Sequence, residues 1–368
     1  MSRCKTLTAS LALALSSLFV LTPASQAAIR TVVVSPVPGN PVASCNDLKA
    51  ALAAIPSPSS TDRWLLKVEP GTYDCQDTYV QMREWVDIEG SGEGQTLITS
   101  YGPGPTAYLK PTVLGANNAE LRELTIGATP NPTPADGIQM GIFLAETSTS
   151  LRRLSVNIDA GVNCDGISIR GGSPVVTDVK VRTVCSNYNY GIINWATLGG
   201  PVGSPAIERV SVLARNATNN HGIAIRDGMV PSVLQDLRVE ASNGTANYGL
   251  HIDLTTSATL VVGESLIEAK TGSGTKYGIY LKGGLVSLHL EHSQVKTAGA
   301  GTKTGIWAQG EHTVEVRSSI VTGSANTLGG TGTFKVGASH LNGGAVAAPA
   351  TCAGVYDENY TFYAATCP

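Results

Sequence analysis

Three residues that can transfer protons stand directly before a glycine: Asp136, Asp165 and His221. Two carboxylates held roughly 5 Å apart, the spacing of neighbouring strands, would raise the pKa of one of them or bind a cation. Asp before Gly is also a common turn residue, whose side chain bonds nearby backbone N–H groups. These three residues are therefore catalytic candidates and, in the alternative, turn or stacking residues. The sequence shows no Ser-His-Asp, phosphate-loop or metal-binding motif.

Aromatic and cationic residues occur at fixed offsets from the same glycines. On a strand whose first residue after glycine points inward, the residue before the glycine and those two and four after it point outward. Rings pack on the apolar faces of sugars, and cations pair with uronate carboxylates. We expect a glycan-binding face, with the alternative that the rings only stack on one another. Its residues are Arg170, Tyr190, Trp195, Arg226, Tyr248, His251, Tyr277, Tyr280, Lys282 and Trp307.

The glycines belong to an internal repeat, in which each is followed by Ile or Leu. Their spacing varies between 25 and 31 residues. A second phrase, of alternating apolar residues, recurs once for each Gly-Ile phrase; an example is LRRLSV from Leu151. Each repeat therefore carries at least two strands. We expect one column of glycines in successive coils, with Ile138 and its equivalents inside and glycine permitting the turn into each strand. The glycines are Gly137, Gly166, Gly191, Gly222, Gly249, Gly278 and Gly305.

Both ends of the repeat array differ from the repeat. Leu48, Leu52 and Ile55 are at helical spacing, which predicts an amphipathic helix covering the first coil. The tail from Leu341 departs from the repeat and predicts the opposite cap. We expect a single domain over 28–368, divided into an N-terminal cap with the first strands (28–75), coils (76–340) and a C-terminal cap (341–368).

The first residues have the features of an export signal. Arg3 and Lys5 precede an apolar run from Leu11 to Leu21, and small residues stand three and one before a cut after Ala27. We expect 1–27 to be a signal peptide. The mature protein would then lie in the periplasm, at the cell surface or in the medium, and no later membrane span is expected.

Six of the seven cysteines follow this signal, an even number suited to disulfides in an oxidising compartment. Proximity in the sequence favours three local pairs, because each pair brackets one local element. A metal cluster is the other interpretation, although no Cys-x-x-Cys or His-rich spacing accompanies these cysteines. The expected pairs are Cys45–Cys75, Cys164–Cys185 and Cys352–Cys367.

Composition narrows the classes of partner. Lys and Arg (25) nearly balance Asp and Glu (28), so no basic field favours nucleic acid or anionic lipid. The 41 glycines and the charged fraction of 14% suit many short strands and turns rather than a helix bundle. We expect no cofactor and no metal, and the oligomeric state is not indicated.

The stacked coils resemble the right-handed parallel β-helix of the pectin-lyase superfamily, over nearly all of the mature chain. The resemblance implies an all-β, right-handed, single-stranded parallel β-helix with an N-terminal capping helix and a disulfide-tied C-terminal cap. Asn163-Cys164-Asp165-Gly166 and His221-Gly222 are similar to motifs of polygalacturonases. The stretch WLLKVEPGTYD from Trp64 resembles the first strands of β-helix pectinesterases.

The chain departs from the polygalacturonase pattern at two places. Asn189-Tyr190 stands where that family has paired acids, and His251-Ile252-Asp253 stands where it has Arg-x-Lys. Inverting hydrolysis needs an acid and a base carboxylate, and Asp165 lacks that partner in the next coil. The resemblance therefore implies fold more than activity. We expect an exported protein that binds an extended polysaccharide on one outward sheet face. The alternatives are a divergent polysaccharide lyase or glycoside hydrolase, and a structural or adhesive envelope protein.

Overall fold

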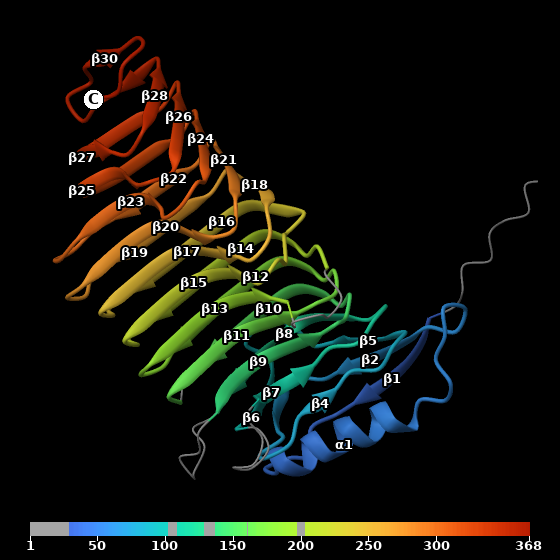
Figure 1. Cartoon of the computed structure of the whole chain (residues 1–368). Helices are drawn as coiled ribbons and strands as arrows, with labels where there is room; N and C mark the ends of the chain where they lie inside the picture. The colour runs from blue at the N-terminus through green and yellow to red at the C-terminus, as the bar shows by residue number, and fades with distance from the viewer. Residues whose placement is uncertain (1–28, 102–108, 129–136, 160, 197–202) are drawn as a thin grey trace, which may run out of the picture.

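Parallel strands stack as rungs along one axis, from the blue N-terminal end to the red C-terminal end (Figure 1). The structure, a computed structural model, describes residues 29–101, 109–128, 137–159, 161–196 and 203–368. The expected signal peptide and Asp136 lie outside these residues. The prediction of an all-β parallel β-solenoid with one short helix is confirmed in the described part of the chain.

The strand pairings run along three faces. The first face joins β1 (Arg30–Val34), β2 (Trp64–Val68), β5 (Val86–Glu89), the first halves of β8 (Glu120–Ala128), β10 (Ser150–Ile158), β12 (Val175–Val184), β14 (Ala206–Arg215) and β16 (Val233–Ser242), then β18 (Ala258–Gly263), β21 (Val286–Glu291), β24 (Thr313–Arg317), β26 (Thr333–Gly337) and β28 (Ala350–Ala353). The second joins β3 (Gly71–Asp74), β6 (Thr96–Ser100), the second halves of β8 to β16, then β19 (Leu266–Lys270), β22 (Gln294–Thr297), β25 (Ile320–Gly330), β27 (His340–Ala347) and β29 (Val355–Tyr356).

The third face carries the Gly-Ile phrases. Its strands are β4 (Val80–Gln81), β7 (Leu109–Leu114), β9 (Ile138–Ala145), β11 (Asn163–Arg170), β13 (Tyr188–Trp195), β15 (Asn219–Arg226), β17 (Ala246–Leu254), β20 (Thr275–Gly283), β23 (Lys303–Ala308) and the second half of β25. Their pairing keeps one register, so a column of buried apolar residues fills the inside. The column consists of Ile142, Ile167, Ile192, Ile223, Leu250, Ile279, Ile306 and Leu328.

From β8 to β16, the corner between the first two faces is a bend within one strand. There the bending residue has a left-handed backbone, as at Asp178 (φ 56°) and Asp236 (φ 52°). After β16 the two faces are formed by separate strands, and a buried serine marks each corner. The backbone N–H of Ser265 donates to the Ser293 hydroxyl at 3.0 Å, and that of Ser293 donates to Ser319 at 3.0 Å. The serines thus connect neighbouring rungs where the strand ladder is interrupted.

The glycine column is confirmed except for its first member. Gly166 lies beside Gly141, because Ile167 pairs with Ile142 and Asp165 pairs with Met140. The expected place of Gly137 and Ile138 in this column is therefore wrong. Residues 137–142 contain two Gly-Ile pairs, and the strand register selects the second one.

Close packing, rather than a turn, explains why glycine is required in this column. A Cβ atom added to Gly222 would lie 2.1 Å from Val239 Cγ1 and 2.6 Å from the carbonyl oxygen of Gly249. Gly166, Gly191 and Gly249 would meet the next rung in the same way. The sequence interpretation of glycine as a turn residue at these places is corrected accordingly.

A row of buried asparagines lies two residues before these glycines. Asn189 Nδ2 donates to Asn220 Oδ1 at 3.2 Å, and Asn220 Nδ2 donates to Asn247 Oδ1 at 2.9 Å. The same amides also donate to backbone carbonyls, among them that of Ser242 at 3.0 Å. Lys276 takes the next place in the row, where its ammonium donates to the carbonyls of Gly274 and Ala300. Each rung of the row thereby supplies donors to the turn beside it.

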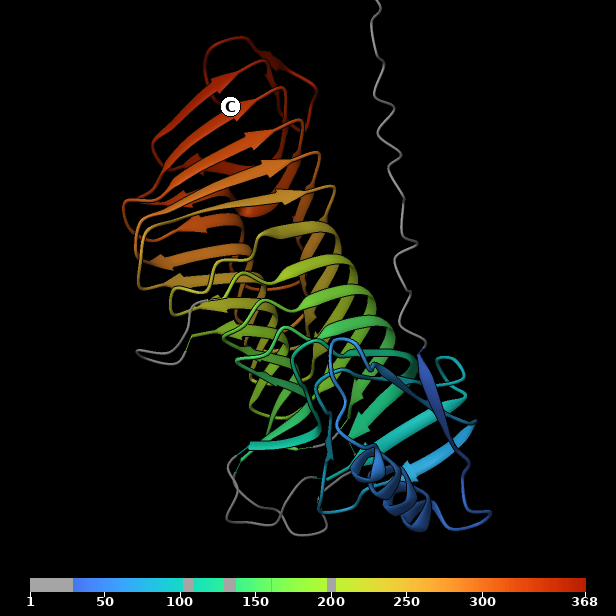
Figure 2. The same ribbon diagram turned by 90° about the vertical axis from the view of Figure 1, so that its right-hand side faces the viewer.

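Both ends of the solenoid are closed as expected. Helix α1 (Pro41–Ala54) lies at the blue end in both views (Figures 1 and 2) and buries Leu48 and Leu52. At the red end β30 (Phe362–Tyr363) pairs antiparallel with β29. The three expected disulfides are confirmed, with Cα–Cα distances of 5.2 Å for Cys45–Cys75, 6.1 Å for Cys164–Cys185 and 5.1 Å for Cys352–Cys367.

Replacing Gly222 by Ala is expected to destabilise the fold. The new Cβ would contact Val239 and the next rung's backbone, and overpacking of this kind typically costs about 1–3 kcal/mol. Gly337→Ala is the matched control, because a Cβ at Gly337 meets nothing within 4 Å. Thermal denaturation of both variants measures the difference. Equal melting temperatures would contradict the assigned packing.

Candidate binding groove

A groove of about 730 Å³ runs across the outside of the third face, over β11, β13, β15, β17 and β20. Rungs lie about 4.8 Å apart, so these strands present side chains at regular steps along one line. The groove combines rings, amides, two cations and two acids. It is lined by Ile138, Asn163, Asp165, Asn187, Tyr188, Tyr190, Ile193, Trp195, Asn219, His221, Arg226, Tyr248, His251, Asp253 and Lys282.

The column directly before the glycines forms a stack of rings. Tyr190 and His221 have ring centroids 4.6 Å apart, and His221 and Tyr248 repeat that distance with an interplanar angle of 6°. Tyr277 continues the stack at 5.7 Å from Tyr248. The inner rings therefore cover one another's faces, so they present edges and phenolic hydroxyls to the groove.

Two histidines from successive rungs meet inside the groove. His251 Nδ1 lies 3.1 Å from His221 Nδ1, so one imidazole donates a hydrogen bond to the other. Burial lowers the pKa of His221 well below its ordinary value, and His251 and Arg226 lower it further. Burial also lowers the pKa of His251 to about 4. Both imidazoles are therefore neutral at pH 7.

Asp165 closes one end of the groove and is buried. Burial raises the pKa of its carboxyl to about 7, and a hydrogen bond from Ser168 and the charge of Arg170 only partly oppose this effect. In the strand register the place beside Asp165 is taken by Met140, whereas Asp136, its expected partner, lies outside the described residues. Asp165 is thus a carboxyl near its titration point at neutral pH.

The column four residues after the glycines carries the charges of the groove. Arg226 pairs in register with Trp195 on one side and with Asp253 on the other. Lys282 follows on the next rung and forms an ion pair with Asp253 at 3.7 Å. Arg170 stacks on the face of Trp195, with its guanidinium carbon 3.8 Å from the ring centroid.

Some polar atoms at this site have no partner among the described residues. The buried Nε of Arg226 and Nε2 of His251 make no hydrogen bond to the described part of the protein. The Nε of Arg170, at the end of the same column, is in the same condition. Buried polar groups are usually hydrogen-bonded, so these atoms have hydrogen-bonding capacity that the described part of the protein leaves unused.

The predicted binding residues divide into two groups. Tyr190, Trp195, Arg226, Tyr248, His251 and Lys282 line the groove, together with the catalytic candidates Asp165 and His221. Arg170, Tyr277, Tyr280 and Trp307 belong to the same three outward columns but do not line it. Tyr280 and Trp307 are tilted against Tyr277 by 37° and 51°, so the ring stack loses its parallel order toward β23.

Sequence reasoning missed the opposite wall of the groove. Asn163, Tyr188 and Asn219 share one register position at the start of three successive strands, and Asn187 lies beside them. Asn187 Nδ2 donates to Asn163 Oδ1 at 3.3 Å. Their signal in the sequence is an Asn in the turn just before a Gly-Ile phrase, a composition that also marks ordinary turns.

The two acids of the groove are too far apart for glycoside hydrolysis by a carboxylate pair. Asp165 is on β11 and Asp253 on β17, three strand steps or about 14 Å apart along the axis, and they are also five residues apart in strand register. Inverting enzymes need roughly 6.5–9.5 Å and retaining enzymes about 5 Å. Among the described residues, no three His, Cys, Asp or Glu side chains gather as metal ligands would.

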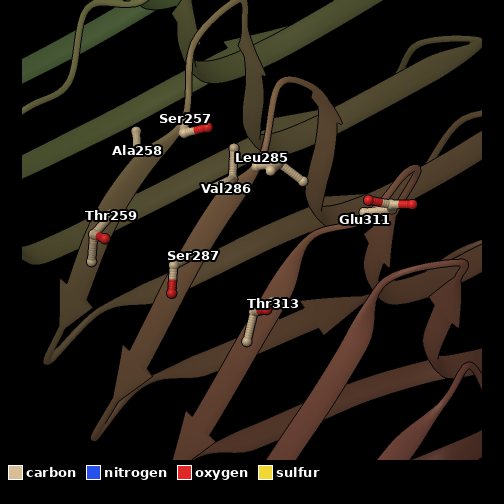
Figure 3. A pocket seen from close by; sticks show the side chains of 8 residues that line it. All are labelled: Ser257, Ala258, Thr259, Leu285, Val286, Ser287, Glu311 and Thr313. Carbon is tan, nitrogen blue, oxygen red and sulfur yellow. The ribbon is translucent and has the colours of Figure 1, made fainter.

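A second hollow lies on the first face, over β18, β21 and β24 (Figure 3). Its side chains are small, hydroxyl-bearing or aliphatic, with Glu311 the titratable group among its lining residues. The hollow measures about 400 Å³ and offers no acid–base pair. Within the described chain, no helix has both the length and the apolar character to cross a membrane.

Comparison with known proteins finds similarity at the level of structure. No protein-family model matches the chain, and no curated protein matches it. The A-module of the Azotobacter vinelandii mannuronan C-5 epimerase AlgE4 is similar at 14% identity and a TM-score of 0.48, over 83% of this chain and 93% of that one. The Dettilon tailspike protein is similar at 12% identity and a TM-score of 0.49, over 89% and 68%. The catalytic unit of the GH87 α-1,3-glucanase from Streptomyces thermodiastaticus is similar at 13% identity and a TM-score of 0.42, over 87% of this chain and 64% of that one.

Asp165 is expected to make the stability of the protein depend on pH. Its pKa is higher in the folded state than in the unfolded chain, so between about pH 4 and pH 7 only the folded state keeps the proton. Rising pH therefore removes stability through this window. Asp165→Asn should leave the melting temperature nearly unchanged at about pH 4 and raise it at about pH 8.

Asp236→Asn is the control for this comparison, because Asp236 is an exposed carboxylate whose left-handed backbone Asn tolerates. The difference between the effects of the two substitutions at each pH isolates the contribution of burial at Asp165. An Asp165→Asn effect that does not change between the two pH values would show that Asp165 keeps an ordinary pKa.

Proposed function

We propose that the protein is exported and binds an extended acidic polysaccharide along the groove of the third face. The observation that carries this proposal is the repetition of side chains along the groove: successive rungs bring rings to its floor, cations to one wall and amides to the opposite wall. An extended glycan also repeats its groups at regular steps. The three disulfides suit a protein that functions in an oxidising compartment.

The stacked rings contribute polar edges rather than open faces to this binding. The rings of Tyr190, His221 and Tyr248 stack face to face, which stiffens the floor of the groove. Their edges remain for hydroxyl groups of a sugar. A preorganised floor lowers the entropy lost on binding, so the structural role of the stack and its binding role support each other.

Arg226 supplies the main charge contact in the proposed complex. Its side chain lines the groove, and its buried Nε lacks a partner in the described part of the chain. A carboxylate is the group that a guanidinium binds most specifically, through two parallel hydrogen bonds.

A second candidate function is proton transfer on the bound polysaccharide, as in a polysaccharide lyase. The neutral pair of His221 and His251 favours it, because a neutral imidazole with an unpartnered nitrogen can accept a proton. Incubating the protein with acidic polysaccharides and measuring new unsaturated or reducing ends tests this function. Binding without chain cleavage would leave the protein as a binding module.

Arg226→Gln should weaken binding to an immobilised acidic polysaccharide by about tenfold or more. A hydrogen bond to a charged group is worth about 1.5–3 kcal/mol, and the glutamine keeps a polar side chain but not the charge. Arg238→Gln removes the same charge from the exposed side of β16 and should not change the affinity. Equal retention of both variants on the column would refute the role of the groove.

Trp195 and Trp307 form a matched pair for testing where the ligand lies. Both are partly buried tryptophans of outward columns, but Trp195 lines the groove and Trp307 does not. Trp195→Ala should reduce polysaccharide binding several-fold, whereas Trp307→Ala should retain it. Melting temperatures of both variants check the fold. A larger loss of binding for Trp307→Ala than for Trp195→Ala would show that the ligand lies nearer to β23.

A further inference from the structure

Cationic residues recur at every second rung along one wall of the groove. The positions four residues after the glycines read Arg170, Trp195, Arg226, Asp253 and Lys282 on β11, β13, β15, β17 and β20. The spacing between successive cations is two strand steps, about 9–10 Å. The rungs between them carry the indole of Trp195, whose face is covered by the Arg170 guanidinium, and the carboxylate of Asp253.

Asp253 places a negative charge between two of the cations. Its side chain stands in register between Arg226 and Lys282 and pairs with Lys282 at 3.7 Å. All three line the same groove as His251. A ligand carboxylate opposite Asp253 would therefore be repelled, while one opposite Arg226 would be attracted.

The opposite wall carries no compensating cation among its described residues. It consists of the amides of Asn163, Asn187 and Asn219 and the phenol of Tyr188. The floor between the walls holds the neutral pair of His221 and His251 and the buried Asp165. Amides and phenols bind hydroxyl and acetamido groups, but without a cation they offset the desolvation of a carboxylate less than Arg226 does.

These two walls restrict the charge pattern of an extended ligand. A pyranose unit in an extended chain advances by roughly one strand step, so alternate sugars face the cations. In a polymer with an acid on every sugar, the remaining carboxylates would face either Trp195 and Asp253 or the neutral amide wall. Both placements leave half of the charges without a partner. A polymer with an acid on every second sugar avoids this cost.

We infer that the groove is selective for a polysaccharide of alternating acidic and uncharged sugars, over a polymer that is acidic at every residue. The inference rests on the proposed function and specifies its ligand. Arg226 and Lys282 bind the carboxylates, Asp253 excludes a carboxylate from the intervening position, and the asparagine wall binds the uncharged sugar.

Calorimetric titration with three probes of equal chain length tests the selectivity. The probes are hyaluronan oligosaccharides, in which a uronate alternates with an N-acetylated sugar, polygalacturonate oligosaccharides, and an uncharged glucan. The hyaluronan probe should bind at least tenfold more tightly than polygalacturonate. Asp253→Asn should narrow this ratio by strengthening the binding of polygalacturonate, whereas Arg226→Gln should weaken both acidic probes.

The outcomes separate this inference from the function on which it rests. Polygalacturonate binding as tightly as hyaluronan, or a ratio unchanged by Asp253→Asn, would overturn the alternating register while leaving polysaccharide binding intact. Equal binding of the uncharged glucan would also overturn it. Failure of all three probes to bind the folded protein would refute both the proposed function and the inference.

Discussion

The rungs of this protein approach one another so closely that a whole column of positions has no room for a side chain. At Gly222, the place of a Cβ is occupied by Val239 from the strand behind it and by the backbone of Gly249 from the next rung. This contact fixes the lateral position of each strand against its neighbours. The inward isoleucines then stack on one another, and the outward residues fall into straight columns. The ring stack and the charged wall both depend on this register.

The interior also needs polar contacts, because the turns between faces leave carbonyl groups that the ladders do not bind. The asparagines Asn189, Asn220 and Asn247 supply donors to these carbonyls and to one another. Lys276 takes over this role on the following rung with an ammonium group, and burial lowers its pKa. The side of the molecule that carries the groove is thus held by directional hydrogen bonds as well as by apolar packing.

The repeat made the fold predictable, since a Gly-Ile phrase in step with an alternating phrase indicates stacked parallel strands. Local cysteine spacing likewise predicted the three disulfides. The first rung was misplaced because Gly137-Ile138 and Gly141-Ile142 fit the same pattern, and only the strand pairing distinguishes them.

Much of the candidate groove was harder to predict. The ring columns follow from the period of a strand, but the coverage of ring faces by their neighbours depends on side-chain rotamers. The wall of Asn163, Asn187 and Asn219 lies in turns of ordinary composition. The raised pKa of Asp165 and the lowered pKa of His221 result mainly from burial, which a strand pattern does not quantify.

Each rung contacts mainly the rung before it and the rung after it, as in other solenoids. Successive glycines of the column from Gly141 to Gly305 are 25 to 31 residues apart. Duplication of one segment of this length would therefore lengthen the molecule without a new kind of contact. On the outside, the same event would add one subsite to the groove and shift every later cation by one rung. Evolution of ligand length in such a protein would then proceed by pairs of duplicated segments, since a single duplication would put the charges out of phase with an alternating polymer.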